Sequence, residues 1–203
     1  MSETKTVEVN LKRRRMLVAA TGVMGATAAT FLATPFVASW QPSERAKALG
    51  APVDVDVSKL APGQLVTVNW RGKPVWVLHR TEEMLATLPK VEPVLRDPES
   101  NESVQPDYCK NRHRSIKPEL FVAIGVCTHL GCAPLFKPEP KDAELGSDWP
   151  GGFFCPCHGS RFDLAGRVFK SVPAPINLEI PPHHYRTDTL IRVGEDPKEG
   201  GQA

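Results

Sequence analysis

Two short stretches, CTHLGC at residues 127–132 and CPCHGS at residues 155–160, hold four of the chain's five cysteines and two of its six histidines. An apolar run precedes each of them, LFVAIGV in the first case and GGFF in the second. Such runs predict buried strands, each of which ends in a tight loop. The two loops are therefore the most chemically distinctive part of the 203-residue chain.

Each loop offers one thiol and one imidazole at short spacing: Cys127 with His129, and Cys155 with His158. Zinc accepts two cysteines and two histidines in a tetrahedral site. A two-iron cluster accepts the same set, with both cysteines on one iron and both histidines on the other. The four residue types alone leave both possibilities open.

Each loop also carries one cysteine more than a four-ligand site needs, Cys132 in the first and Cys157 in the second. In an exported domain the compartment is oxidising, and spare thiols tend to pair there. A Cys132–Cys157 disulfide would tie the loops into one rigid cap, which a zinc finger in a reducing compartment would not need.

CTHLGC and CPCHGS match, position by position, the loop motifs of the Rieske iron–sulfur proteins of cytochrome bc and related complexes. VPAP at 172–175 resembles the proline loop of that family, and GKPVWVLHRT at 72–81 is similar to its quinol-oxidising branch. The resemblance covers nearly the whole chain and favours the Rieske subunits of bacterial ubiquinol–cytochrome c reductases. It implies an all-β soluble domain of stacked antiparallel sheets with a small cluster-binding subdomain, on a single N-terminal transmembrane helix.

The resemblance also implies one Rieske-type [2Fe-2S] cluster and a role for each residue of the two loops. Cys127 and Cys155 would hold the buried iron, and His129 and His158 the outer one. Cys132 and Cys157 would form the disulfide. The Ser160 hydroxyl would donate to a bridging sulfide, and Leu130 would shield the cluster and dock at the quinol pocket.

By the same resemblance, His158 would hydrogen-bond ubiquinol and, with Leu130, act directly in catalysis. The head would take an electron and a proton from ubiquinol and pass the electron to cytochrome c1, while the second electron goes to cytochrome b. The chain would thus be an enzyme subunit within a dimeric quinol–cytochrome c reductase.

Two positions depart from the family. Phe162 stands where quinol-oxidising members often carry a tyrosine that bonds a ligand sulfur, so one hydrogen bond to the cluster is absent. Lys170-Ser171 stands where many relatives have a glycine, so the turn before VPAP should differ locally.

The N-terminal segment predicts a membrane anchor. A polar, basic stretch at 1–15 ends in KRRR, and the apolar run at 16–40 that follows is long enough to cross a bilayer. The basic cluster predicts a cytoplasmic N-terminus, and hence a periplasmic C-terminal domain on the bacterial inner membrane. A cleaved signal peptide is the alternative, but its apolar region is usually shorter. RRRML at 13–17 also resembles a twin-arginine export signal.

The rest of the chain divides by composition. Residues 41–52 predict a flexible linker, residues 53–194 the soluble domain, and residues 195–203 a polar tail. The cluster-binding part would cover about 125–175. Within the domain we expect a strand at 53–60, a hairpin over 64–80, a short helix at 81–88, and a surface insertion at 97–118.

The remaining cysteine and a neighbouring pair of histidines are expected to have no role in metal binding. Cys109 should be a free, buried thiol, and His183 with His184 a surface pair.

A formal net charge of +2, with 24% charged residues, argues against nucleic acid as a partner. The alternative functions are a Rieske ferredoxin or oxygenase component, whose relatives usually lack the two extra cysteines and the anchor, and a structural zinc module.

Overall fold

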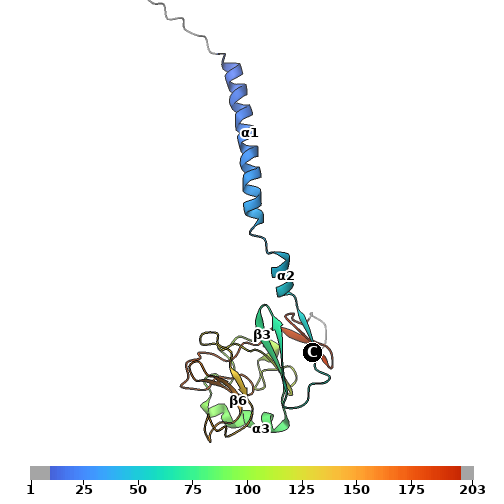
Figure 1. Ribbon diagram of the computed structural model, residues 1–203, viewed down its shortest axis with the longest axis vertical. Coiled ribbons are helices and arrows are strands. Elements are labelled where there is room, and N and C mark those ends of the chain that lie inside the picture. Colours follow the sequence, from blue (N-terminus) through green and yellow to red (C-terminus); the bar gives the residue numbers. More distant parts are fainter. Residues whose placement is uncertain (1–9, 198–203) are drawn as a thin grey trace, which may run out of the picture. The chain divides into compact units, whose positions relative to one another are not determined.

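The computed structural model describes residues 10–197, which belong to two units that meet between Lys47 and Ala48. The first contains helix α1 and the start of α2, and the second contains all the strands (Figure 1).

Helix α1 spans Leu11–Ala38, and every side chain along it is exposed. It begins five residues before the predicted start because the Asn10 side chain caps it, accepting from the Arg13 amide at 3.1 Å. The hydroxyls of Thr27, Thr30 and Thr34 donate to carbonyls one turn back, so these polar groups are satisfied within the helix. The helix is long and apolar enough to cross a membrane.

The segment predicted as a flexible linker contains a second helix, α2, at Glu44–Gly50. Ser43 accepts from the Ala46 amide at 3.2 Å, and Lys47 pairs with Glu44 at 2.7 Å. A helix of seven residues buries nothing of its own here, so these local bonds are its main support. The polar composition of residues 41–52 and the prolines near their ends give no sign of this helix.

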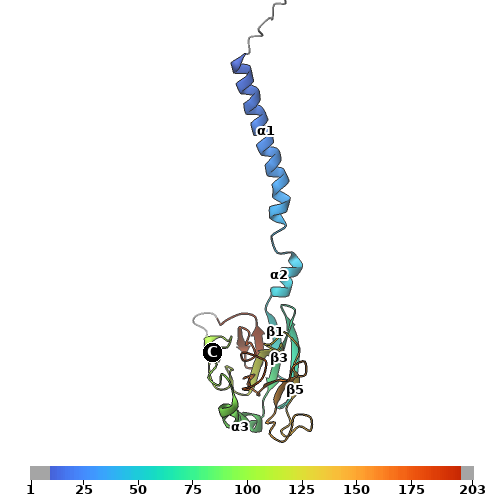
Figure 2. The same cartoon turned by 90° about the vertical axis from the view of Figure 1, so that its left-hand side faces the viewer.

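The second unit contains three antiparallel sheets of three strands each (Figures 1 and 2). The middle sheet has the order β2-β3-β4, formed by Leu65–Trp70, Lys73–His79 and Leu120–Ile124. The second has the order β1-β9-β8, formed by Val53–Asp56, Leu190–Val193 and His183–Thr187. The third has the order β5-β6-β7, formed by Leu135–Lys137, Gly152–Cys155 and Ser160–Phe162.

Strands β3 and β4 of the middle sheet are buried on both faces, because they are apolar at nearly every position, whereas β2 exposes Thr67 and Asn69. Side chains alternate along a strand, so Val75 and Val77 point into one core while Trp76 and Leu78 point into another. The first core lies against the β1-β9-β8 sheet. The second also contains residues of the β5-β6-β7 sheet, and with them Cys127 and Cys155.

The predicted hairpin over 64–80 is present as β2 and β3. Trp70 pairs with Lys73, which leaves Arg71 and Gly72 as a two-residue loop. Both have positive φ, 51° and 72°, as a type I′ turn requires.

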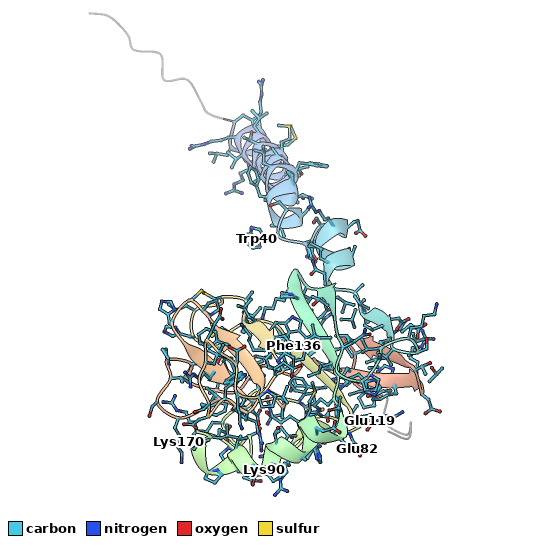
Figure 3. All side chains as sticks on the ribbon, turned by 60° about the horizontal axis from the view of Figure 1, so that its bottom comes forward. Trp40, Glu82, Lys90, Glu119, Phe136 and Lys170 are labelled. Carbon is cyan, nitrogen blue, oxygen red and sulfur yellow. A yellow bond between two sulfur atoms is a disulfide. The ribbon has the colours of Figure 1, made fainter. Side chains whose placement is uncertain are left out.

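Helix α3 spans Glu82–Val91, and Figure 3 labels Glu82 and Lys90 along it. The Thr81 hydroxyl caps it, accepting from the Met84 amide at 3.2 Å. Leu88 is fully buried in the core that also contains Cys127 and Cys155, so this helix closes that core. Two short 3-10 turns, at Glu92–Val94 and Asp107–Cys109, follow it.

The prediction of a surface insertion at 97–118 is wrong for one side of that segment. Arg114 is fully buried and donates to the carbonyls of Ala165 at 3.2 Å and Leu178 at 2.8 Å. Asp97 is only 6% exposed. Buried polar groups of this kind are bonded to distant backbone, which gives no periodic signal in the sequence.

A buried ion pair joins the loop after β7 to helix α3. Asp163 accepts from Nη2 of Arg167 at 2.8 Å and from the amides of Arg167 and Ala165 at 2.7 and 3.0 Å. Nη2 of Arg167 also donates to the Leu88 carbonyl at 2.7 Å. Neither charged group is more than 1% exposed, and Asp163 is the buried partner of Arg167, which also pairs with the half-buried Glu92 at 3.4 Å.

We therefore expect Asp163→Ala to reduce the free energy of unfolding by about 3 kcal/mol, because Arg167 would lose its buried counter-charge and keep only the half-buried Glu92. Thermal unfolding followed by circular dichroism measures this. Asp54→Ala is the matched control, since its partners Arg186 and Arg192 lie at the surface and lose little. Equal losses for the two variants would contradict the role given to the buried pair.

Candidate metal centre

The first cysteine loop closes on itself directly after β4. The Cys127 amide donates to the Cys132 carbonyl at 2.8 Å, and the Gly131 amide donates to the Cys127 carbonyl at 3.0 Å. Gly131 has a φ of 83°, a conformation that a side chain disfavours. The glycine of CTHLGC is thus required by the turn.

The second loop has an equivalent turn between β6 and β7. Cys155 pairs with Ser160 across the hairpin, and the Gly159 amide donates to the Cys155 carbonyl at 2.9 Å. Gly159 has a φ of 77°. In both loops, therefore, a cysteine carbonyl accepts from a left-handed glycine four residues later, which explains the likeness of the two motifs.

Cys132 and Cys157 form a disulfide, as predicted, and it joins the two loops. Disulfides are drawn as yellow bonds in Figure 3. The loops therefore have a fixed separation that does not depend on the packing of their exposed side chains.

The other two loop cysteines are buried beneath this disulfide. Cys127 and Cys155 are 2% and 1% exposed and form no disulfide within residues 10–197. Burial raises the pKa of the Cys127 thiol, and the His129 amide and the Ser160 hydroxyl oppose that rise because they donate to its sulfur. The Cys155 sulfur lies within 4.8 Å of both disulfide sulfurs, but those two are already bonded and cannot serve as ligands beside it.

The two histidines of the loops face one another. The ring centroids of His129 and His158 are 4.7 Å apart, with an angle of 89° between the ring planes. His158 is exposed, whereas His129 is half-buried. Nδ1 of His129 is buried and has no hydrogen-bond partner among the residues that the structure describes.

This donor set fits a metal centre. A buried imidazole nitrogen without a partner is costly, and a metal ligated by that nitrogen would compensate it. Two buried thiols and a second imidazole lie in the same pair of linked loops. The structure thus places the four predicted ligand residues in two loops joined by the disulfide, with the two imidazoles facing each other. Cys₂His₂ chemistry suits zinc or a two-iron cluster alike.

Ser160 and Leu130 occupy opposite surroundings at this site. Ser160 is fully buried, and its oxygen accepts from the Ala174 amide at 3.1 Å. Leu130 is 72% exposed, which is high for a large apolar side chain. Ser160 thus lies opposite Cys155 in the hairpin, whereas Leu130 presents its side chain at the surface.

The proline segment comprises residues 172–176. The turn before it contains a residue other than glycine in the left-handed conformation. Ser171 has a φ of 58°, which few residues other than glycine and asparagine adopt readily. The serine therefore takes a backbone conformation that a glycine would adopt more easily.

An aromatic cluster lies beneath the loops and was not predicted. Phe153 of β6 stacks on Trp76 at 4.8 Å between ring centroids and packs on Phe136 at 5.4 Å. A side chain at Gly125 would overlap the Trp76 ring, so the glycine before Val126 permits this packing. In the sequence, Gly125 is the one indication of this packing, and glycine also occurs for many other structural reasons. Phe162 is also fully buried in this core.

Thr128 is a further site residue that the sequence reasoning missed. Its hydroxyl donates to the Ile176 carbonyl at 2.7 Å and so links the first cysteine loop to the proline segment. The contact spans 48 residues of sequence, and a threonine inside CTHLGC gives no hint of it.

The predictions for Cys109 and for the pair His183 and His184 can be compared with the structure. Cys109 is buried and free, as predicted, and burial raises the pKa of its thiol to about 12. The surface placement of His183 is wrong, since this residue is 1% exposed and bonds the Pro181 carbonyl at 2.9 Å. His184 is only partly buried.

Comparison with known proteins gives a consistent result. The family described as "Rieske [2Fe-2S] domain" matches residues 51–182, and that described as "Ubiquitinol-cytochrome C reductase Fe-S subunit TAT signal" matches residues 2–43. The chain is 64% identical to the ubiquinol-cytochrome c reductase iron-sulfur subunit of Allochromatium vinosum, over 93% of this chain and 91% of that protein. The corresponding subunits of Rhodospirillum rubrum and Blastochloris viridis are 41% and 40% identical, over 90% and 96% of this chain and 91% and 98% of those proteins.

The cysteine pairing predicts a definite peptide map. Protein denatured in the presence of an alkylating agent, without reductant, should yield one linked pair of peptides containing Cys132 and Cys157. The thiols of Cys109, Cys127 and Cys155 should all be alkylated. Mass spectrometry of the digest, with a reduced sample as control, measures both. Alkylation of Cys132 and Cys157 in the non-reduced sample would contradict the disulfide.

Proposed function

Because this chain belongs to the Rieske iron–sulfur family, as the [2Fe-2S] subunit of a ubiquinol–cytochrome c reductase, we propose that its linked loops hold the cluster through two thiols and two imidazoles. Cys127 and Cys155 would hold the inner iron, and His129 and His158 would hold the outer iron. The supporting observation is that the two thiols are buried, while His158 is exposed. The buried, unpartnered Nδ1 of His129 supports the same set.

The cluster, when bound, accepts one electron at a reduction potential that histidine ligation raises well above that of all-cysteine centres. The two imidazoles have a second task, because each has one ring nitrogen left after ligation. That nitrogen can hold a proton or release it. In His158 it lies on an exposed side chain, where a hydroxyl of ubiquinol can reach it. His158 is thus the catalytic residue that receives the proton.

The exposed tip of the loops would bind the site at which ubiquinol is oxidised. Leu130 is 72% exposed next to His129, and burial of its side chain against an apolar pocket would stabilise the docked state. Leu130 therefore contributes to catalysis by excluding water around His158. The same tip would serve electron delivery, since the exposed His158 would present a cluster ligand to the partner.

The partners follow from membership of a cytochrome bc1 assembly. The chain is a subunit of such an assembly, and cytochrome b and cytochrome c1 are the partners it implies. We propose ubiquinol as the substrate and a dimeric complex as the assembly. The electron then passes from this subunit to cytochrome c1.

The N-terminal helix would anchor the subunit in the membrane. Residues 11–38 can cross a membrane, and a twin-arginine export signal matches residues 2–43. We propose that the helix is retained as a single anchor in the bacterial inner membrane. The basic residues at its start remain in the cytoplasm, and the domain with the linked loops faces the periplasm.

Two measurements on the purified subunit test the proposal. Analysis should give two iron atoms and two acid-labile sulfides per chain, and the reduced protein should give a rhombic EPR signal. One zinc and no sulfide would contradict it. Purification in mild detergent should also yield haem proteins together with this chain, which tests its partners.

Substitution of a histidine ligand should abolish the cluster. Neither His129→Ala nor His158→Ala leaves a nearby residue that could replace the lost imidazole, so the EPR signal and quinol oxidation should both be lost. His184→Ala is the control, because that histidine lies in β8 and should leave the signal unchanged. A His158→Ala protein with a normal signal would remove His158 from the ligand set.

Phe162→Tyr should raise the reduction potential. If the ring occupies the position of the family's tyrosine, its hydroxyl donates to a ligand sulfur, and that bond strengthens when reduction adds negative charge. A difference of about 1 kcal/mol between redox states corresponds to roughly 40 mV for one electron. Ser160→Ala should lower the potential for the converse reason. Redox titration by EPR measures both, and a Phe162→Tyr protein at or below the wild-type potential would show that its hydroxyl does not reach the sulfur.

A further inference from the structure

The proline segment is fixed by side chains from elsewhere in the chain. Nη1 of Arg96 donates to the carbonyls of Ala174 at 3.3 Å and Pro175 at 3.2 Å. The Thr128 hydroxyl donates to the next carbonyl, that of Ile176. Three successive carbonyls are therefore satisfied by side chains and none by a strand partner, so the position of the segment depends on those side chains.

Asn177 ties the end of this segment to the insertion. Its amide donates to the Ser103 hydroxyl at 3.1 Å. Its side-chain nitrogen donates to the Asp97 carbonyl at 2.9 Å and to the Ser100 hydroxyl at 3.0 Å, and its side-chain oxygen accepts from the Val168 amide at 2.8 Å. Asn177 is fully buried and both ends of its side chain are bonded, so it is held in one orientation.

The insertion is itself ordered where it makes these bonds. The buried carboxylate of Asp97 accepts from the amides of Asn101 at 2.7 Å and Glu102 at 3.1 Å, and from the Ser103 hydroxyl at 2.7 Å. Ser103 thus bonds Asp97 and Asn177 at once. It connects an ordered turn of the insertion to the end of the proline segment.

The proline segment in turn contacts Ser160. The Ala174 amide donates to the Ser160 oxygen at 3.1 Å, and both residues are fully buried. A hydroxyl has a single hydrogen to donate. Since its oxygen already accepts from Ala174, that hydrogen points elsewhere. Cys155 lies directly opposite Ser160 across the hairpin, so the two side chains are neighbours on the same face. The place of Ala174 therefore orients the Ser160 donor.

We propose that Arg96 and Ser103 are positioning residues for the electron-transfer site: they hold the proline segment, and through the Ala174 amide they direct the Ser160 hydroxyl toward the cluster ligands. This inference rests on the proposed function in one respect, that Ser160 donates to the cluster or its ligands. Residues far outside the two cysteine loops thereby contribute to the reduction potential.

A double-mutant cycle on the intact chain with its cluster tests the route through Ser160. Ser103→Ala and Arg96→Gln are each made in the wild type and in Ser160→Ala, and the midpoint is measured by EPR titration. In the wild-type background each should reduce the ratio of reduced to oxidised protein at fixed potential about threefold, which is about 28 mV for one electron. In the Ser160→Ala background neither should change it further. Ser147→Ala, whose hydroxyl bonds Asp148 in an exposed loop, should titrate as wild type.

The outcomes are distinct. Wild-type midpoints for both Ser103→Ala and Arg96→Gln would overturn the inference, as would equal falls in the two backgrounds, which would indicate an effect that does not pass through Ser160. Because the two substitutions act on different bonds, a folding defect in one leaves the other as a test. A Ser160→Ala protein that titrates as wild type would instead contradict the proposed role of Ser160, and this inference with it.

Discussion

The fixed separation of two turns is the constraint on which the site depends. Cys127 and Cys155 lie on turns from different strands, and both must present their sulfurs to one centre. The outer residues of these turns, such as His158 and Leu130, are exposed and have little to pack against. The Cys132–Cys157 disulfide therefore fixes the separation of the two turns by a covalent bond, since side-chain packing cannot fix it there. Below it, the aromatic core around Phe153 supports both turns from one side.

The sides of the site are supported in a different way, by buried guanidinium groups. Much of the backbone around the cysteine loops is irregular, so its carbonyls need partners other than strand neighbours. Arg80 donates to the carbonyls of Pro118, His113 and Leu164, and Arg114 to those of Ala165 and Leu178. Burial lowers the pKa of Arg80 to about 9, which still leaves it charged at neutral pH. Planar groups with several donors can thus replace regular secondary structure around an irregular site.

The loops and the strands were predictable because their signals are local. CTHLGC and CPCHGS contain their own ligands, their disulfide cysteines and the glycines that their turns need, and the hairpin of β2 and β3 follows from two apolar runs around Arg71-Gly72. The buried side of the 97–118 insertion and the burial of His183 were not predictable in this way. Both depend on single polar residues that bond backbone far away in sequence, as Arg114 does with Ala165 and Leu178. Only the folded chain brings such partners together.

The amide of Ile124 donates to the carbonyl of Glu179 at 2.8 Å, so the chain leaves the middle sheet and returns to it at nearly the same point. The first and last strands, β1 and β9, meanwhile pair with each other. The residues between Gly125 and Leu178 therefore form a cassette. Its two ends are held together by the framework, which consists of the β1-β9-β8 and β2-β3-β4 sheets. Lengthening such a cassette adds little closure entropy, since that cost grows only with the logarithm of length. The redox-active part of this molecule can thus change in length at little entropic cost, provided that its contacts with Trp76 of the framework and with Arg114 are kept.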